Sequence, residues 1–265
     1  MQITAVIKWS AKHFPDNPVL MPVVADTWDG DLSNYLVFPI REQHVFDALE
    51  GAKSGPVAEG SVGGGTGMYC HDFKAGIGTS SRVLAAEDGA YSVGVLVQTN
   101  YGDRDELRVA GVPVGRELST LLPEYHEASA KETTNEERKG RSVIVVVATD
   151  APLSPLTLKA LARRATLGLA RNGATASPFS GDVVIAFSTM KYEWVDGPPE
   201  RMRTETVGPY EMGPLFTATI QATEEAVINS LVAAETMTGL NGTTVHALPH
   251  DELRDVLRRY NRLNE

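Results

Sequence analysis

The polarity of the chain changes abruptly at Ser142, and this change limits the possible folds more than any other feature of the sequence. Residues 131–141 (KETTNEERKGR) contain no apolar side chain, whereas residues 143–148 (VIVVVA) are apolar throughout. A charged segment of this kind cannot bury surface and stays solvated, while a short β-branched run is typical of a buried strand. Ser142 therefore joins an exposed, cleavable loop to a core strand.

Cleavage between Arg141 and Ser142 would place two reactive groups on this serine. The hydroxyl and a new α-amine would then lie on one residue at the end of a core strand. An α-amine has a reference pKa of about 7.7–8.0, so it can accept a proton near neutral pH. The alternative interpretation is a linker serine that only begins a strand.

Size and composition indicate one soluble domain. A chain of 265 residues with 42% hydrophobic and 22% charged residues is ordinary for a globular protein, and we expect a single domain over residues 1–265. No apolar run approaches the roughly 20 residues of a membrane span, so no membrane partner is expected. The net charge of −10 argues against nucleic acid, whose phosphates require a basic surface.

The cysteine content and the N-terminus predict a location. Cys70 is the only cysteine, so no intrachain disulfide can form and a reducing compartment is expected. Residues 1–10 (MQITAVIKWS) lack the basic segment and following apolar run of a secretory signal. We expect a cytoplasmic protein.

Hydrophobic periodicity predicts an α+β fold. Strands are expected at residues 20–25, 73–84, 91–99, 107–112, 143–148 and 182–189. Helices are expected at residues 1–14, 42–52, 155–171, 223–237 and from 251 onward. Ser154 and Pro155 form an N-cap and first-turn pair for one of these helices. Strands that pair early, covered by helices that follow later, predict a layered sandwich.

The strongest glycine cluster, residues 60–67 (GSVGGGTG), raises the possibility of nucleotide binding. Glycine-rich turns let backbone amides approach phosphate closely. The residues that follow, 68–78 (MYCHDFKAGIG), contain no lysine–serine or lysine–threonine pair and indicate a strand instead of a helix. Such a loop can equally admit a substrate beside a nucleophile, or simply supply positive φ angles.

Other common catalytic centres fit the sequence poorly. His246 and His250 are separated by Pro249, which denies them the shared helical face of a zinc pair. Cys70 and His71 are adjacent and would point to opposite sides of a strand. We therefore expect no metal and no cofactor. The chain also lacks a G-x-S-x-G elbow, so a reactive serine would need a base other than a triad histidine.

Five segments closely resemble the L-aminopeptidase/D-Ala-esterase/amidase family, which includes the β-peptidyl aminopeptidases, and they occur in the family's order. These are residues 60–82, 92–102, 141–155, 180–189 and 229–249. The resemblance implies an αββα sandwich similar to N-terminal nucleophile hydrolases. It also implies a precursor that cleaves itself before the nucleophilic serine, giving subunits 1–141 and 142–265, and assembly into homo-oligomers. The implied substrates are small peptides, amides or esters with a free N-terminal amine.

The resemblance also assigns roles to individual residues. Ser142 matches the nucleophile, and Ser180 and Asp182 match a serine and an acid that orient it and hold its ammonium form. Asn100 matches the asparagine that donates a hydrogen bond to the oxyanion. Asp26, which receives the substrate amine, and Trp28, beside the oxyanion, are the expected substrate-binding residues, together with Gly64 and Gly65 of the glycine cluster.

The chain departs from the family pattern at several positions. Asp26 stands where glutamate is expected, Trp28 where some relatives have tyrosine, and Arg141 where glycine or asparagine is usual. Relatives also carry a substantial segment before the part that matches here, so the sequence resembles a form truncated at its N-terminus. These departures keep one alternative open, an unprocessed and inactive homologue that acts as a binding or assembly protein.

Overall fold

A four-stranded sheet forms the centre of the protein. In the computed structural model its strand order is β3 (Ile77–Val83), β4 (Ser92–Thr99), β5 (Val143–Thr149) and β6 (Val183–Ser188). The first three strands pair antiparallel, and β5 pairs with β6 in parallel. The structure describes residues 2–16, 21–125, 142–175, 180–190, 193–195, 201–203, 205–239 and 242–263.

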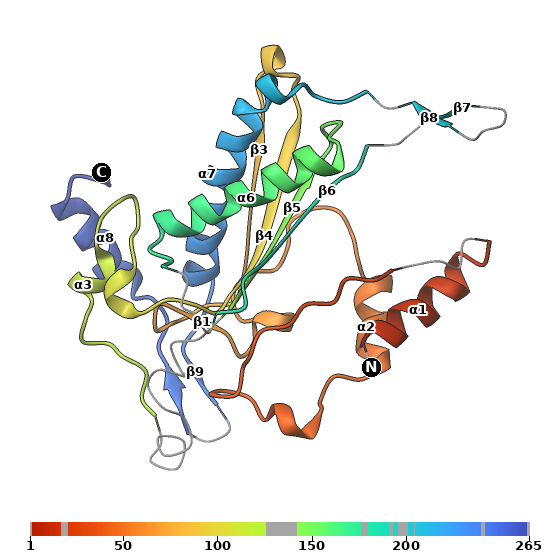
Figure 1. Cartoon of the computed structure of the whole chain (residues 1–265). Coiled ribbons are helices and arrows are strands. Elements are labelled where there is room, and N and C mark those ends of the chain that lie inside the picture. The colour runs from red at the N-terminus through yellow and green to blue at the C-terminus, as the bar shows by residue number, and fades with distance from the viewer. Residues whose placement is uncertain are drawn as a thin grey trace.

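Two helices, α6 (Pro155–Arg171) and α7 (Gly213–Val232), cover one face of this sheet (Figure 1). Alternate valines of β4 and β5 point into that interface and are buried, as the two-residue period of a strand requires. They are Val93, Val95, Val97, Val143, Val145 and Val147. The packing is close because small residues meet in this interface. Gly78 of β3 faces Ala226 of α7, and a Cβ at Gly78 would overlap the carbonyl oxygen of Ala226.

The opposite face of the sheet is more open. Leu96, Val146 and Ile185 alternate with the buried positions and are only partly buried, while Phe187 on edge strand β6 is 44% exposed. At one end this face is covered by two loops, residues 21–34 and the glycine-rich residues 60–67, through contacts described below.

The N-terminal helices form a separate pair. Helix α1 (Gln2–His13) packs against α2 (Glu42–Glu50), with Lys8 Nζ 2.6 Å from Glu42 Oε2, and the pair lies to one side of the sheet (Figure 1).

The remaining elements are short, apart from the amphipathic helix α8 (His250–Arg259). They comprise the helix α3 (Val114–Glu117) and the strand pairs β1 (Tyr69–Cys70) with β2 (Phe73–Lys74), β7 (Glu193–Val195) with β8 (Arg201–Arg203), and β9 (Met237–Thr238) with β10 (Thr244–Val245). The 3-10 turns are η1 (Tyr35–Val37), η2 (Gly63–Gly65), η3 (Ala86–Asp88), η4 (Arg104–Glu106) and η5 (Pro209–Glu211).

Most predicted elements are present, but several differ in kind or in bounds. The expected strand at 73–84 divides into β2 and β3, and the helix expected to reach 237 ends at Val232. The expected strand at 20–25 is wrong over its described residues: residues 21–25 form no strand, and Met21 is 88% exposed. Residues 107–112 form only a single bridge between Val109 and Val112. Helix α7 begins at Gly213, ten residues before the expected start, because Pro214 at its first turn is a good helix initiator.

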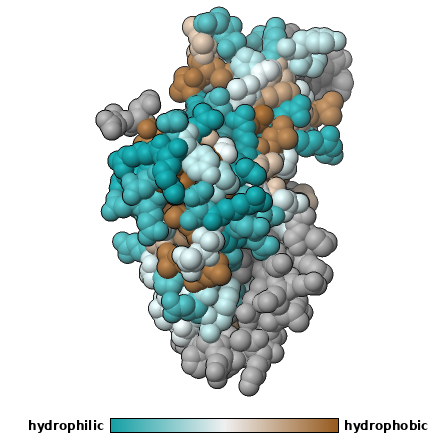
Figure 2. Space-filling view, turned by 90° about the vertical axis from the view of Figure 1, so that its left-hand side faces the viewer, coloured by the Kyte–Doolittle hydropathy of each residue, from teal (hydrophilic) through white to brown (hydrophobic). Residues whose placement is uncertain are grey.

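The surface that includes α8 and α3 is mainly hydrophilic, with apolar side chains in separate patches (Figure 2). Among the described residues, none of the helices combines the length and apolar character needed to cross a membrane.

Candidate active site

Ser142 lies at the head of the central strand β5, between two other strands. Thr99 pairs with Val143 and Ile144 pairs with Val183. Continuing both ladders by one or two residues sets Ser142 opposite Asn100 on one side and Gly181 on the other. Neighbouring strands are about 4.8 Å apart, so the predicted nucleophile, the predicted oxyanion donor and the Ser180–Asp182 turn meet at one end of the sheet.

The turn on β6 holds the hydroxyl of the partly exposed Ser142. The backbone N–H of Gly181 donates a hydrogen bond to Ser142 Oγ at 2.9 Å. On either side of that glycine, Ser180 Oγ donates to Asp182 Oδ1 at 2.6 Å. Both side chains therefore occupy the turn beside the serine. Arg141, the residue expected before the cleavage point, lies outside the described residues.

Asn100 is completely buried, and its amide is held at both ends. Its Nδ2 donates to the carbonyl oxygen of Trp28 at 2.8 Å, and its Oδ1 accepts from the backbone N–H of Tyr69 at 3.4 Å. An amide nitrogen carries two hydrogens, and the bond to Trp28 uses one of them. The side chain is thus fixed in orientation by Trp28 and Tyr69.

The following residue, Tyr101, is buried at the same strand end. Burial raises the pKa of Tyr101 well above its ordinary value, with further contributions from the Cys70 side chain and from the charge of Asp182.

The loop with Asp26 and Trp28 is attached to the sheet by Thr27. This buried threonine accepts a hydrogen bond from Gln98 Nε2 at 2.7 Å, and its hydroxyl contacts Met68 Sδ at 2.8 Å. The backbone N–H of Thr27 donates to Asp26 Oδ1 at 2.8 Å. Asp26 itself is exposed and Trp28 is 40% exposed, so both side chains are accessible.

The glycine-rich loop packs over the same strand. A Cβ at Gly64 would overlap Gln98 Oε1, so a larger residue at this position would displace the side chain of Gln98. Gly64 is exposed and Gly65 is buried beneath it. The two predicted substrate-binding glycines are therefore near Asn100, which lies two residues after Gln98 on the same strand.

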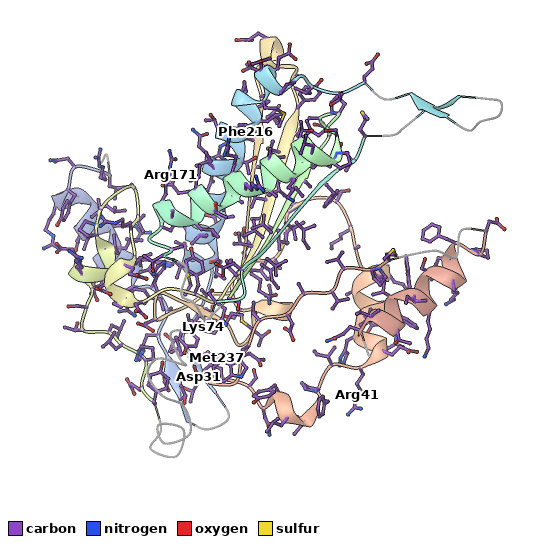
Figure 3. The ribbon with its side chains drawn as sticks, viewed as in Figure 1. Asp31, Arg41, Lys74, Arg171, Phe216 and Met237 are labelled. Atoms are coloured by element: carbon purple, nitrogen blue, oxygen red, sulfur yellow. The ribbon has the colours of Figure 1, made fainter. Side chains whose placement is uncertain are left out.

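Lys74 is a buried charge below this loop that the sequence did not reveal (Figure 3). Its ammonium donates to the carbonyl oxygens of Met68 at 2.8 Å, Ala75 at 2.9 Å and Gly65 at 3.4 Å. Burial lowers the pKa of Lys74 to about 8. A lysine in a short strand would ordinarily be expected at the surface, and nothing local signals that these carbonyls surround it.

A second polar group missed by sequence reasoning lies nearby. Tyr69 Oη donates to a carboxylate oxygen of buried Asp31 and lies 3.3 Å from Tyr125 Oη. Met237 packs against the same cluster, and Figure 3 shows Asp31, Met237 and Lys74 in one region. This cluster holds Tyr69 in place, and the backbone N–H of Tyr69 orients Asn100.

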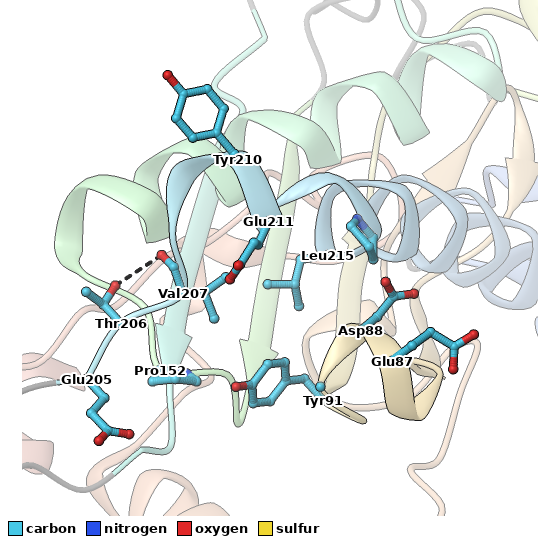
Figure 4. A pocket seen from close by; sticks show the side chains of 12 residues that line it. Glu87, Asp88, Tyr91, Pro152, Glu205, Thr206, Val207, Tyr210, Glu211 and Leu215 are labelled. Atoms are coloured by element: carbon cyan, nitrogen blue, oxygen red, sulfur yellow. Dashed lines mark hydrogen bonds between the residues drawn. The ribbon is translucent and has the colours of Figure 1, made fainter.

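A hollow in the surface lies elsewhere. A cavity of about 540 Å³ is lined by the carboxylates of Glu87, Asp88, Glu205 and Glu211 and by Pro152 (Figure 4). Strand β5 runs from Ser142 toward Pro152, so this cavity lies at the far end of the sheet and contains none of the predicted site residues. Among the described side chains, no three metal-binding groups gather closely enough to hold an ion.

Comparisons with known proteins bear on both the fold and the family. Residues 1–245 match the model of Peptidase family S58. The chain is 46% identical over 259 residues to the beta-peptidyl aminopeptidase BapA of Sphingosinicella xenopeptidilytica, covering 96% of this chain and 64% of that protein. It is 47% identical over 262 residues to the BapA of Sphingosinicella microcystinivorans, covering 98% and 66%. The chain thus spans about two thirds of the length of these curated relatives.

Solved structures of similar proteins share the fold of this chain. The L-aminopeptidase D-Ala-esterase/amidase of Ochrobactrum anthropi, described as a variant of the Ntn hydrolase fold, superposes with a TM-score of 0.86 at 39% identity, covering 100% of this chain and 71% of that one. A Burkholderia sp. beta-aminopeptidase gives 0.82 at 39% identity, covering 97% and 70%. The predicted α+β fold resembling N-terminal nucleophile hydrolases is confirmed.

Proposed function

Because the chain belongs to Peptidase family S58, we propose that it is a self-processing serine aminopeptidase or amidase that releases N-terminal residues from small peptides, amides or esters. The observation that carries the proposal is the position of Ser142 at the head of β5, between Asn100 on β4 and the Ser180–Asp182 turn before β6. One side supplies a donor for an oxyanion, and the other supplies groups that orient the nucleophile.

Self-processing would create the working nucleophile. Ser142 Oγ attacks the carbonyl carbon of Arg141, and the acyl group shifts from nitrogen to oxygen to give an ester. Water hydrolyses the ester, which leaves the carboxylate on Arg141 and a free α-amine on Ser142. The products are the proposed subunits 1–141 and 142–265.

In turnover, the α-amine of Ser142 acts as the base for its own hydroxyl. Because the N–H of Gly181 donates to Ser142 Oγ, the hydroxyl hydrogen remains available for the amine. Oγ attacks the substrate carbonyl, and the second Nδ2 hydrogen of Asn100 stabilises the oxyanion. The ammonium passes its proton to the leaving amine or alcohol, and water then hydrolyses the acyl-enzyme.

The Ser180–Asp182 pair supports the charge that forms on the nucleophile. A carboxylate beside the developing ammonium of Ser142 stabilises its protonated form, and the hydrogen bond from Ser180 keeps that carboxylate in the turn. Asp26, exposed at the edge of the site, would bind the free amine of the substrate.

We also propose that the enzyme works in the cytoplasm as a homo-oligomer. Cys70 is the single cysteine of the sequence, so no intrachain disulfide can form, which suits a reducing compartment. The family resemblance supports the assembly.

Release of a chromophore from amino-acid p-nitroanilides tests the proposed activity. The wild-type protein should release nitroaniline, and Ser142→Ala should abolish both release and the appearance of two fragments in denaturing electrophoresis. Ser81→Ala, an exposed serine on β3, is the matched control and should leave both unchanged. A wild-type chain that stays intact and inactive would instead support the inactive-homologue alternative.

A further inference from the structure

Gln98 occupies a position beside both predicted reacting groups. It lies two residues before Asn100 on β4, and its cross-strand partner on β5 is Ile144, two residues after Ser142. Side chains two residues apart on a strand point to the same face. Gln98 therefore faces the same side of the sheet as Asn100, away from the helices, and it is partly exposed.

The side chain of Gln98 is also coupled to the predicted amine-binding residue. Gln98 Nε2 donates to Thr27 Oγ1 at 2.7 Å, and Asp26 Oδ1 accepts from the backbone N–H of Thr27 at 2.8 Å. The amide of Gln98 and the carboxylate of Asp26 thus contact two atoms of one buried residue. Thr27 fixes the two groups close to each other.

The amide oxygen of Gln98 remains available as an acceptor. Within the part of the chain that the structure describes, no hydrogen bond reaches Gln98 Oε1, which lies under the exposed Gly64. Gly64 has no side chain to cover this oxygen, and a Cβ there would collide with it. The glycine thus lets this acceptor keep its position, on the strand next to that of the nucleophile.

From this geometry we propose that Gln98 is a substrate-binding residue whose Oε1 accepts a hydrogen bond from the N-terminal ammonium of the substrate, beside the carboxylate of Asp26. The inference rests on the proposed function and extends its substrate site. An ammonium has three N–H donors, which Asp26 alone does not satisfy. A second, neutral acceptor completes its coordination without adding charge. The site thereby selects a primary amine over an acylated N-terminus.

Two substitutions separate substrate binding from a structural role. Gln98→Met keeps the length of the side chain but removes the acceptor. Loss of a hydrogen bond to a charged donor should raise KM for an amino-acid p-nitroanilide by roughly 10-fold or more, with kcat retained. Gln98→Glu removes the N–H that donates to Thr27 but keeps an acceptor oxygen, and its negative charge attracts the ammonium, so its KM should be no higher than that of the wild type.

Two controls complete the experiment: the self-cleavage of each variant, and a substitution far from the site. Both variants should still yield fragments split before Ser142, and Gln43→Met, on α2, should leave KM unchanged. A KM for Gln98→Met within twofold of the wild type overturns the inference. An equal rise in KM for both Gln98 variants also overturns the inference, because it would mean that Gln98 only holds Thr27 in place and does not bind the substrate. A wild-type protein without cleavage or hydrolysis overturns the proposed function itself, and the inference with it.

Discussion

Replacing Lys74 by methionine tests how the charge below the glycine-rich loop affects stability. Its ammonium is fully buried and contacts three backbone carbonyls. Burial lowers the pKa of Lys74 from an ordinary value of 10.5 to about 8. The unfolded chain therefore keeps this proton to higher pH than the folded protein does. Stability rises with pH wherever the unfolded state binds more protons, so the folded state should gain stability between about pH 8 and 10.5.

The size of this gain follows from the pKa difference. Each pKa unit is worth about 1.4 kcal/mol, so the drop in the pKa of Lys74 corresponds to about 3 kcal/mol over the whole window. Below pH 8 the lysine is protonated in both states and adds no pH dependence. Other titrating groups contribute equally to parent and variant, so the difference between them isolates Lys74.

Urea unfolding measures this difference directly. The parent should carry Ser142→Ala, so that a single uncleaved chain unfolds and its transition can be treated as two-state. Between pH 7 and 10.5, the unfolding free energy of the parent should rise by about 3 kcal/mol relative to Lys74→Met. Lys53→Met, an exposed lysine, should show no such trend. Parallel pH curves for the parent and Lys74→Met would refute the reasoning, because they would mean that the ammonium is solvated.

Two further substitutions test the site and the packing beneath it. Asn100→Ala should lower kcat by about 10²–10³ with a smaller change in KM, as expected for loss of an oxyanion donor; an unchanged kcat in steady-state assays would remove Asn100 from that role. Gly78→Ala should destabilise the fold, because a Cβ there overlaps the Ala226 carbonyl in the interface between β3 and α7. Thermal unfolding should show a lowered Tm, while Gly94→Ala, where a Cβ has open space, should be tolerated.

The elements with strong local signals could be predicted from the sequence. Residues 143–148 are apolar and β-branched, so their burial in the central strand β5 follows from composition alone. Helix α6 begins where Ser154 and Pro155 predict, and the side chain of Ser154 accepts from the N–H of Thr157 as an N-cap should. These signals act over a few residues and need no distant partner.

The errors arise where an apolar pattern depends on such a partner. Met21 and Val23 fit a strand pattern, but no strand pairs with them in the described structure and both are exposed. A strand is stable only with a neighbour that satisfies its backbone groups. The early start of α7 was missed for a different reason, since its first turn contains Gly213 and Pro214, which also occur in loops.

The predicted site residues came from motifs, but the groups that position them did not. The N–H of Tyr69 and the carbonyl of Trp28 orient Asn100 across 31 and 72 positions of sequence. Gln98 likewise acts through a contact with Thr27, 71 positions away in the chain. The carbonyls around Lys74 are close in sequence, at Gly65, Met68 and Ala75, but they meet its ammonium only because this segment folds back on itself. Spacing along a strand cannot reveal such contacts, because they depend on how the loops fold back onto the sheet.

The intact mass of the purified wild-type protein under denaturing conditions tests the central claim most directly. Self-processing predicts two species, one of which begins at Ser142, and their masses should sum to that of the chain plus one water. The same preparation with Ser142→Ala should give one uncleaved species. A wild-type protein that shows only the full-length mass of 28.5 kDa would contradict the account, because Ser142 would then lack the free amine on which the mechanism depends.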